Sequence, residues 1–94
     1  MKLEWSAIAL ADLDRFAAFL HDRDPRLARI VAAEITQKAQ VLQDRPELGK
    51  PIEGNKRYRE VVLQVLNALY VFQYVYDGKR LVMLRVFHGR EARE

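Results

Sequence analysis

The chain has 94 residues, with 16 lysines and arginines against 13 aspartates and glutamates, and it has no cysteine. Half of it is hydrophobic and 31% is charged, which is typical of a folded globular protein and excludes wholesale disorder. This length supports one core, so we expect a single domain over residues 1–94. The lack of cysteine excludes disulfides and thiolate metal sites, and no stretch looks like a signal peptide or a membrane span, which favours a cytoplasmic protein.

Positive charge is concentrated in the second half of the sequence. Residues 1–48 hold seven basic and eight acidic side chains, whereas residues 49–94 hold nine basic and five acidic ones. Eleven of the basic residues are arginine, whose planar guanidinium suits contacts with phosphate or carboxylate groups. We expect an anionic partner to contact this second half, although a solvated surface explains the charge equally well.

The first part of the chain predicts a short strand and a helix. Over residues 2–5, polar and apolar side chains alternate as in an edge strand. A helix is expected over about 7–21, because apolar residues recur there every three or four positions, and Ser6 is its predicted N-cap. The spacing places Leu10 on the buried face of this helix and Asp12 outside that face.

A second helix is predicted from Pro25 to about Gln43. Asp24 supplies a capping side chain, and Pro25 stands at the first helical position. The apolar residues of this helix again form one stripe, so we expect the two helices to pair as an antiparallel hairpin. Prolines and glycines in the following segment, residues 44–55, exclude a regular helix there.

The remaining residues predict an antiparallel meander. Its three strands are expected over 57–66, 69–76 and 80–88, with Asp77 and Gly78 as a two-residue hairpin turn between the last two. One face of the middle strand carries an aromatic row, which consists of Tyr70, Phe72, Tyr74 and Tyr76. A bare row of this size exceeds the apolar patches of most soluble monomers, so we expect a partner or ligand to cover it.

The candidate chemical residues are polar side chains in or after these strands. They include Arg59, Arg85, His88 and Arg90. If they converged, a histidine beside guanidinium groups would suit phosphodiester cleavage without a metal ion. Alternation nevertheless puts Arg85 and His88 on opposite faces unless a bulge intervenes, and structural roles for His88 and Arg59 stay open.

Several motifs occur in a recognisable order. They are EWS near the start, ALADL at 9–13, PELGKP at 46–51, YRE at 58–60, a YxFxY-type strand and a closing LRVFHGR. Together they resemble the RelE/ParE superfamily of bacterial toxins from type II toxin–antitoxin pairs, over the whole chain. The resemblance implies an α+β fold with an N-terminal strand, and a helical hairpin packed on a three- to four-stranded antiparallel sheet. It also implies a cognate antitoxin whose tail covers the aromatic row, in complexes of higher order.

The superfamily has two functional branches, and the resemblance leaves both open. ParE-like members bind DNA gyrase, stop growth and stabilise plasmids, and the candidate target contacts are then Arg85, Arg90 and Arg93. RelE-like members cleave mRNA on the ribosome, and Arg59, His88 and Arg90 would then be catalytic. The LGKP and YRE segments favour the ParE-like branch, as does the lack of a tyrosine after His88. A third alternative is a non-toxic chain that acts only in operon autoregulation with its antitoxin. None of the three implies a cofactor or a metal.

Overall fold

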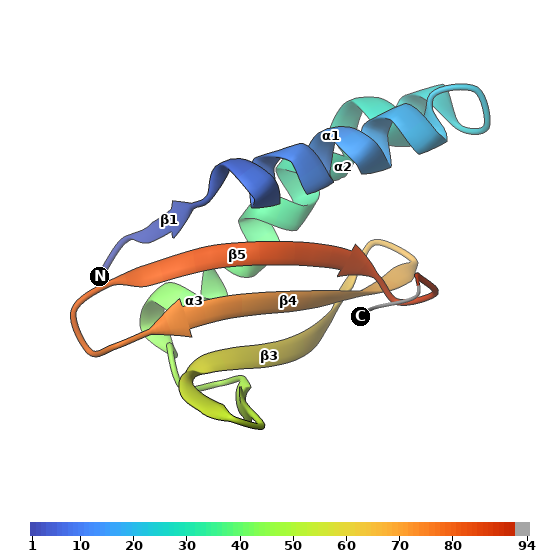
Figure 1. Cartoon of the computed structure of the whole chain (residues 1–94). Coiled ribbons are helices and arrows are strands. Elements are labelled where there is room, and N and C mark those ends of the chain that lie inside the picture. Colours follow the sequence, from blue (N-terminus) through green and yellow to red (C-terminus); the bar gives the residue numbers. More distant parts are fainter. Residues whose placement is uncertain (92–94) are drawn as a thin grey trace.

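A helical hairpin lies across one face of a five-stranded sheet in the computed structural model, which describes residues 1–91 (Figure 1). The helices are α1 (Ala7–Leu20), α2 (Pro25–Ala39) and α3 (Val41–Asp44). The strands are β1 (Leu3–Trp5), β2 (Lys50–Ile52), β3 (Asn55–Val65), β4 (Ala68–Tyr76) and β5 (Leu81–His88). Their order across the sheet is β1-β5-β4-β3-β2, with β1 parallel to β5 and the other pairs antiparallel. The predicted α+β fold is confirmed.

Both long helices begin at the predicted caps. The Ser6 hydroxyl accepts a hydrogen bond from the Ala9 amide at 3.0 Å, and the Asp24 carboxylate accepts one from the Leu27 amide at 3.1 Å. Each bond satisfies an amide that the first turn of a helix leaves without a partner. The two helices then pack as a hairpin whose tip projects beyond the sheet (Figure 1).

Two details of the helices differ from the prediction. Leu10 is 50% exposed, whereas Ala9 and Asp12 are buried, so α1 presents a neighbouring stripe to the sheet. This stripe faces the sheet because the Asp12 carboxylate accepts hydrogen bonds from β5, as described below. These bonds stabilise the fold more than the burial of Leu10 would. The second helix ends at Ala39 and not near Gln43, and the short helix α3 follows it.

The meander of β3, β4 and β5 is present, but its turns differ from those expected. Four residues, Asp77 to Arg80, join β4 to β5, and the Asp77 carboxylate organises them by accepting two amide hydrogen bonds. The two-residue turn is instead Leu66–Asn67, which connects the paired residues Val65 and Ala68. Leu66 adopts a φ of 56° there, a left-handed conformation that is uncommon for leucine.

The sheet is also wider than predicted. Residues 50–52, for which only a regular helix was excluded, form β2 against the start of β3, with a register shift after Pro51. Apolar side chains from both layers form one core, in which Val31 and Ile35 of α2 and Phe72 and Leu81 of the sheet are fully buried. No helix in residues 1–91 is long and apolar enough to cross a membrane.

Candidate functional site: an apolar cleft at the hairpin tip

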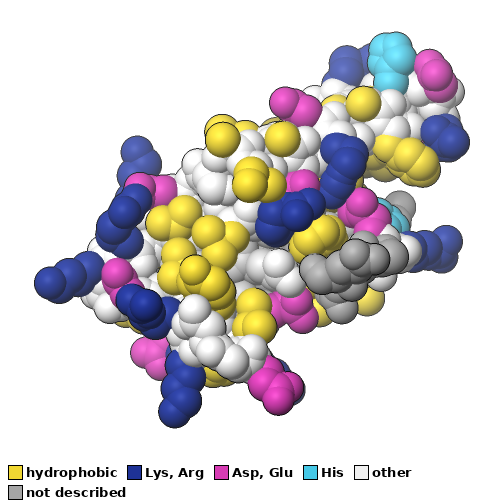
Figure 2. All heavy atoms as spheres, in the orientation of Figure 1, with side chains coloured by type: hydrophobic (Ala, Val, Ile, Leu, Met, Phe, Trp, Pro, Cys, Tyr) yellow, Lys and Arg dark blue, Asp and Glu magenta, His cyan; other side chains and the backbone are white. Residues whose placement is uncertain are grey.

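A cleft of about 560 Å³ opens between the hairpin tip and the end of the sheet where β4 begins and β5 ends. Its walls are mostly apolar and its rim carries charged side chains; the lining residues are Arg15, Phe16, Phe19, Leu20, Leu27, Ala68, Tyr70, His88, Arg90 and Glu91. Figure 2 shows the corresponding notch, with hydrophobic side chains on the underside of the hairpin tip. We call this feature the hairpin cleft.

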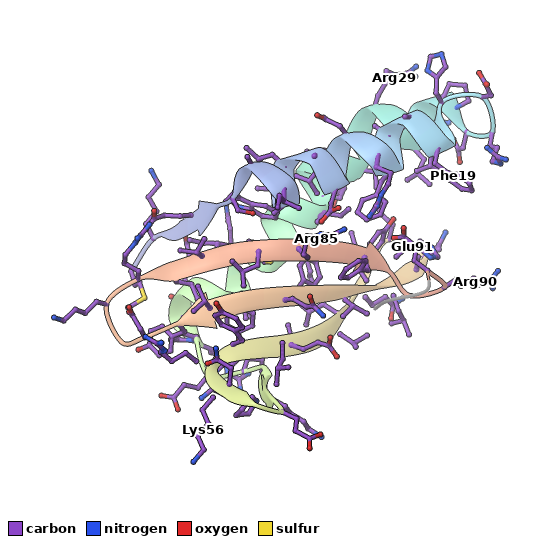
Figure 3. The ribbon with its side chains drawn as sticks, viewed as in Figure 1. Phe19, Arg29, Lys56, Arg85, Arg90 and Glu91 are labelled. Carbon is purple, nitrogen blue, oxygen red and sulfur yellow. The ribbon has the colours of Figure 1, made fainter. Side chains whose placement is uncertain are left out.

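Phe19 is the most exposed large apolar side chain of the cleft. It is 60% exposed and extends from α1 toward the end of β5 (Figure 3). The Arg23 guanidinium lies 4.3 Å from the centre of its ring and also donates a hydrogen bond to the Phe19 carbonyl. This contact holds an aromatic ring in solvent, where it is available to a partner.

The rim of the cleft is an ion-paired corner built by Arg15 and Glu91. The Arg15 guanidinium bonds the Glu91 carboxylate at 3.2 Å and the Val86 carbonyl at 3.3 Å. The same carboxylate accepts the His88 amide. These contacts tie the segment after β5 to α1, so the cleft has a fixed wall on this side.

The His88 side chain packs and forms a hydrogen bond at this corner. Its ring meets the Tyr70 ring edge-on with centres 5.2 Å apart, and its Nδ1 atom accepts the Arg90 amide at 3.1 Å. Burial, together with the nearby charge of Glu91, raises the pKa of the Tyr70 hydroxyl above its usual value of 10.0. Arg90 itself is exposed, and its side chain points away from the body of the protein (Figure 3).

Arg59 lies in a different part of the sheet. Its guanidinium donates to the Gly49 carbonyl at 2.7 Å and to the Glu47 carbonyl at 3.3 Å, and the side chain is only 17% exposed. Along β4, the partner of Arg59 is Tyr74 and the partner of His88 is Tyr70. Four residues of strand and two strand spacings separate the two side chains by roughly 16 Å, so they do not share a site.

Arg85 belongs to the junction between α1 and β5. Its guanidinium forms two hydrogen bonds with the Asp12 carboxylate, at 3.0 and 3.2 Å, which raise the pKa of Arg85 above its usual value. The same carboxylate accepts the Val86 amide at 2.8 Å, and the Ser6 hydroxyl donates to the Leu84 carbonyl. Side chains of α1 and its cap therefore satisfy the edge of β5 beyond the end of β1.

A bulge in β5 changes the predicted faces of this strand. Arg85 pairs with Gln73 and Met83 with Tyr74, so Leu84 is an extra residue. Because the alternation shifts at this point, Met83 and Val86 are both buried against the helices. Strict alternation would place Leu81, Met83, Arg85 and Phe87 on one face, and the bulge breaks this pattern. Arg85 and His88 lie on opposite faces, as predicted, because the bulge precedes both.

The aromatic row of β4 is not a bare face. Tyr70, Phe72 and Tyr74 are buried under the helices, and Tyr76 is partly buried against the same core. The Tyr74 hydroxyl donates to the Pro46 carbonyl and accepts from the Gly49 amide, both at 2.8 Å. The expectation of an uncovered aromatic surface is wrong, because this row faces the helical layer; only Tyr70 reaches the hairpin cleft.

Sequence reasoning missed Phe19, the most exposed large apolar side chain of the cleft. Phe19 lies outside the buried stripe of α1, and an exposed phenylalanine off that stripe was the signal that could have identified it. Arg93, a predicted target contact, lies outside the described residues. In residues 1–91, no group of three or more histidine, aspartate or glutamate side chains is placed to hold a metal ion.

Comparison with known proteins identifies the class of this fold. A solved chain from the chromosomal ParDE TA system of P. aeruginosa superposes with a TM-score of 0.75 and 24% sequence identity, covering 94% of this chain and 95% of that one. The fold is thus shared with a component of a toxin–antitoxin system. Residues 3–93 match the family described as the ParE toxin of the type II toxin-antitoxin system, parDE. The chain belongs to this ParE toxin family. No curated protein matches it.

Proposed function

We propose that this chain is a growth-inhibiting toxin that binds DNA gyrase in the cytoplasm, and that a cognate antitoxin neutralises it by occupying the hairpin cleft. Membership of the ParE toxin family supports the first part. The observation that carries the second part is the apolar lining of the cleft, with Phe19 exposed at its mouth. A protein segment with apolar anchors gains free energy by covering such a surface.

The chemistry of the cleft specifies the antitoxin segment. Its floor, which includes Phe16 and Tyr70, accepts an aliphatic or aromatic side chain. Arg90 stands exposed at the rim and suits an acidic residue beside that anchor. We therefore expect an amphipathic antitoxin segment that combines an apolar stripe with carboxylates.

Binding is favoured over RNA cleavage because two of the proposed catalytic residues, Arg59 and His88, have structural contacts and lie far apart. Arg59 supports the loop at Glu47 and Gly49, and His88 supports the segment after β5. Of the predicted target contacts, Arg85 is committed to Asp12, whereas Arg90 is exposed. Arg90 is accordingly the candidate gyrase contact that the described residues offer.

The target is tested by expressing the chain alone in a bacterium and following chromosome replication and transcript integrity. We expect replication to stall while transcripts stay intact, and the purified chain to inhibit supercoiling by gyrase and raise the level of cleaved DNA. Arg90→Ala should weaken this inhibition, whereas Arg29→Ala, which removes an exposed charge from α2, should not. Codon-phased transcript cleavage would instead support the ribonuclease, and normal growth would support the non-toxic alternative.

The antitoxin site is tested separately with Phe19→Asp. This variant places a charge at the mouth of the cleft, so the cognate antitoxin should bind it more weakly and should fail to restore growth. Ile30→Asp is the matched control, because Ile30 is 45% exposed on α2 and does not line the cleft. Equal rescue of both variants by the antitoxin would place the antitoxin elsewhere on the toxin.

A further inference from the structure

The end of the sheet opposite the hairpin cleft has an excess of basic side chains. Because β1 and β5 are parallel and their neighbours antiparallel, the starts of β1, β5 and β3 and the end of β4 all lie at this end. It carries five exposed cations from three distant parts of the sequence: Lys2, Lys56, Arg57, Lys79 and Arg80. Figure 2 shows lysine and arginine side chains gathered at this end, on the left of the view. We call these five residues the basic end.

The carboxylates of Glu4, Glu53 and Asp77 offset part of this charge, but few of the cations are paired directly. Within residues 1–91, only Arg80 of the five forms a salt bridge, with Glu4 at 2.8 Å. The Asp77 carboxylate accepts the amides of Lys79 and Arg80 at 2.9 and 2.8 Å and keeps its negative charge at this end. Those bonds lower the pKa of Asp77 below 3.8 and fix the turn from which Lys79 projects.

We propose that the basic end binds the sugar-phosphate backbone of duplex DNA. Four adjacent strands at about 4.8 Å spacing make a row roughly 14 Å long, which matches about four phosphates along one DNA strand. The strands fix the row, so few backbone degrees of freedom are lost on binding. This contact lies at the other end of the sheet from the hairpin cleft, so the chain can hold DNA and a protein partner together.

Duplex DNA fits this surface better than an acidic protein does. A protein interface buries an apolar centre inside a polar rim, whereas contacts with DNA are polar and positively charged. Cations are the most numerous exposed side chains at this end, where the carboxylates of Glu53 and Asp77 and the apolar side chains of Met1 and Tyr58 are exposed as well. Contacts with phosphates alone carry no sequence information, so binding should not depend on DNA sequence.

The test measures the anisotropy of a fluorescein-labelled 20-base-pair duplex titrated with the full chain between 50 and 200 mM KCl. Four neutralised phosphates predict a slope of log K against log salt of about −3.6, and an affinity loss of about 150-fold over this range. Lys79→Gln and Arg57→Gln should each reduce the magnitude of the slope by about 1. Arg29→Gln removes the same charge from α2 and should leave the slope unchanged; circular dichroism checks that each variant is folded.

Several outcomes would overturn the proposal. They are undetectable binding at 50 mM KCl, a slope that the basic-end variants do not change, or an equal effect of Arg29→Gln. Tighter binding of an oligoglutamate peptide than of DNA would assign the surface to an acidic protein instead. The inference does not rest on the gyrase proposal, because it is measured with DNA and the toxin alone. A toxin with the predicted slope but no effect on gyrase would separate the two.

Discussion

Removing the Asp12 carboxylate should destabilise this protein more than any exposed acidic substitution. Asp12 is the buried charged residue of α1, and it accepts hydrogen bonds from the Val86 amide at 2.8 Å and from the Arg85 guanidinium at 3.0 and 3.2 Å. Asp12→Ala leaves the Val86 amide without an acceptor, which costs about 1–3 kcal/mol. The ion pairs with Arg85 and Arg15 together add about 1 kcal/mol, because these side chains are 40% and 39% exposed and water replaces part of each interaction.

The expected loss is therefore about 2–4 kcal/mol of the free energy of unfolding, a large part of the roughly 5–15 kcal/mol of a typical domain. Urea denaturation followed by circular dichroism measures it, and for a domain of this size the midpoint of thermal unfolding should fall by about 10–25 °C. Asp12→Asn should cost less, because its amide oxygen can still accept the Val86 amide. Asp14→Ala is the control, because Asp14 is exposed on the same helix, and its effect should stay within about 0.5 kcal/mol.

A loss below about 1 kcal/mol for Asp12→Ala, with an unchanged dependence of the unfolding free energy on urea, would refute this account. It would mean that water or a rearranged side chain satisfies the β5 edge as well as Asp12 does. Equal losses for the Asp12 and Asp14 variants would show that the helix, and not the edge of the strand, is sensitive to the change.

Other changes test the loop and the turn. Tyr74→Phe leaves the Gly49 amide without its acceptor and should cost about 1–3 kcal/mol in urea denaturation, whereas Tyr58→Phe, with a 42% exposed side chain, should cost almost nothing. Gly49→Ala brings a Cβ atom within 2.8 Å of the Tyr74 hydroxyl, so it should destabilise by about 1–3 kcal/mol; a stability equal to wild type would contradict the close packing. Amide bonds lower the folded-state pKa of Asp77, so its contribution is present above pH 3.8 and is lost as pH falls through the lower folded value. Asp77→Asn should therefore flatten the acid side of the stability profile, and an unchanged profile would contradict this.

The elements of the fold follow from local patterns, and they were predicted well. Ser6 and Asp24 cap the helices because their side chains bond amides three residues ahead, a signal that a single segment carries. The alternation of the meander is equally local. The strand pairing of residues 50–52 could not be predicted in this way, because Pro51 and its neighbours have no strand pattern of their own and pair only when the start of β3 is present.

The errors in the candidate site share one physical cause. Which face of β4 meets the helices depends on the packing of the whole sheet, so the row containing Phe72 and Tyr74 could be read as a surface when it is the core. The bulge at Leu84 and the burial of Asp12 are likewise linked. The Val86 amide at the edge of β5 needs an acceptor, and Asp12 of α1 supplies it. A buried carboxylate looks unfavourable from the helix pattern alone, and it becomes favourable only beside the strand whose edge it completes.

The two binding surfaces were harder to predict from the sequence than the fold. The hairpin cleft joins Phe19 of α1 to Tyr70 of β4, and the basic end joins Lys2 to Lys79, so both combine residues more than 50 positions apart. Neither surface has a local motif, since each arises where the topology brings element ends together. The two lie at opposite ends of one rigid sheet, so a change at one should leave binding at the other intact. An antitoxin that weakened DNA binding without touching Lys2 or Lys79 would contradict that independence.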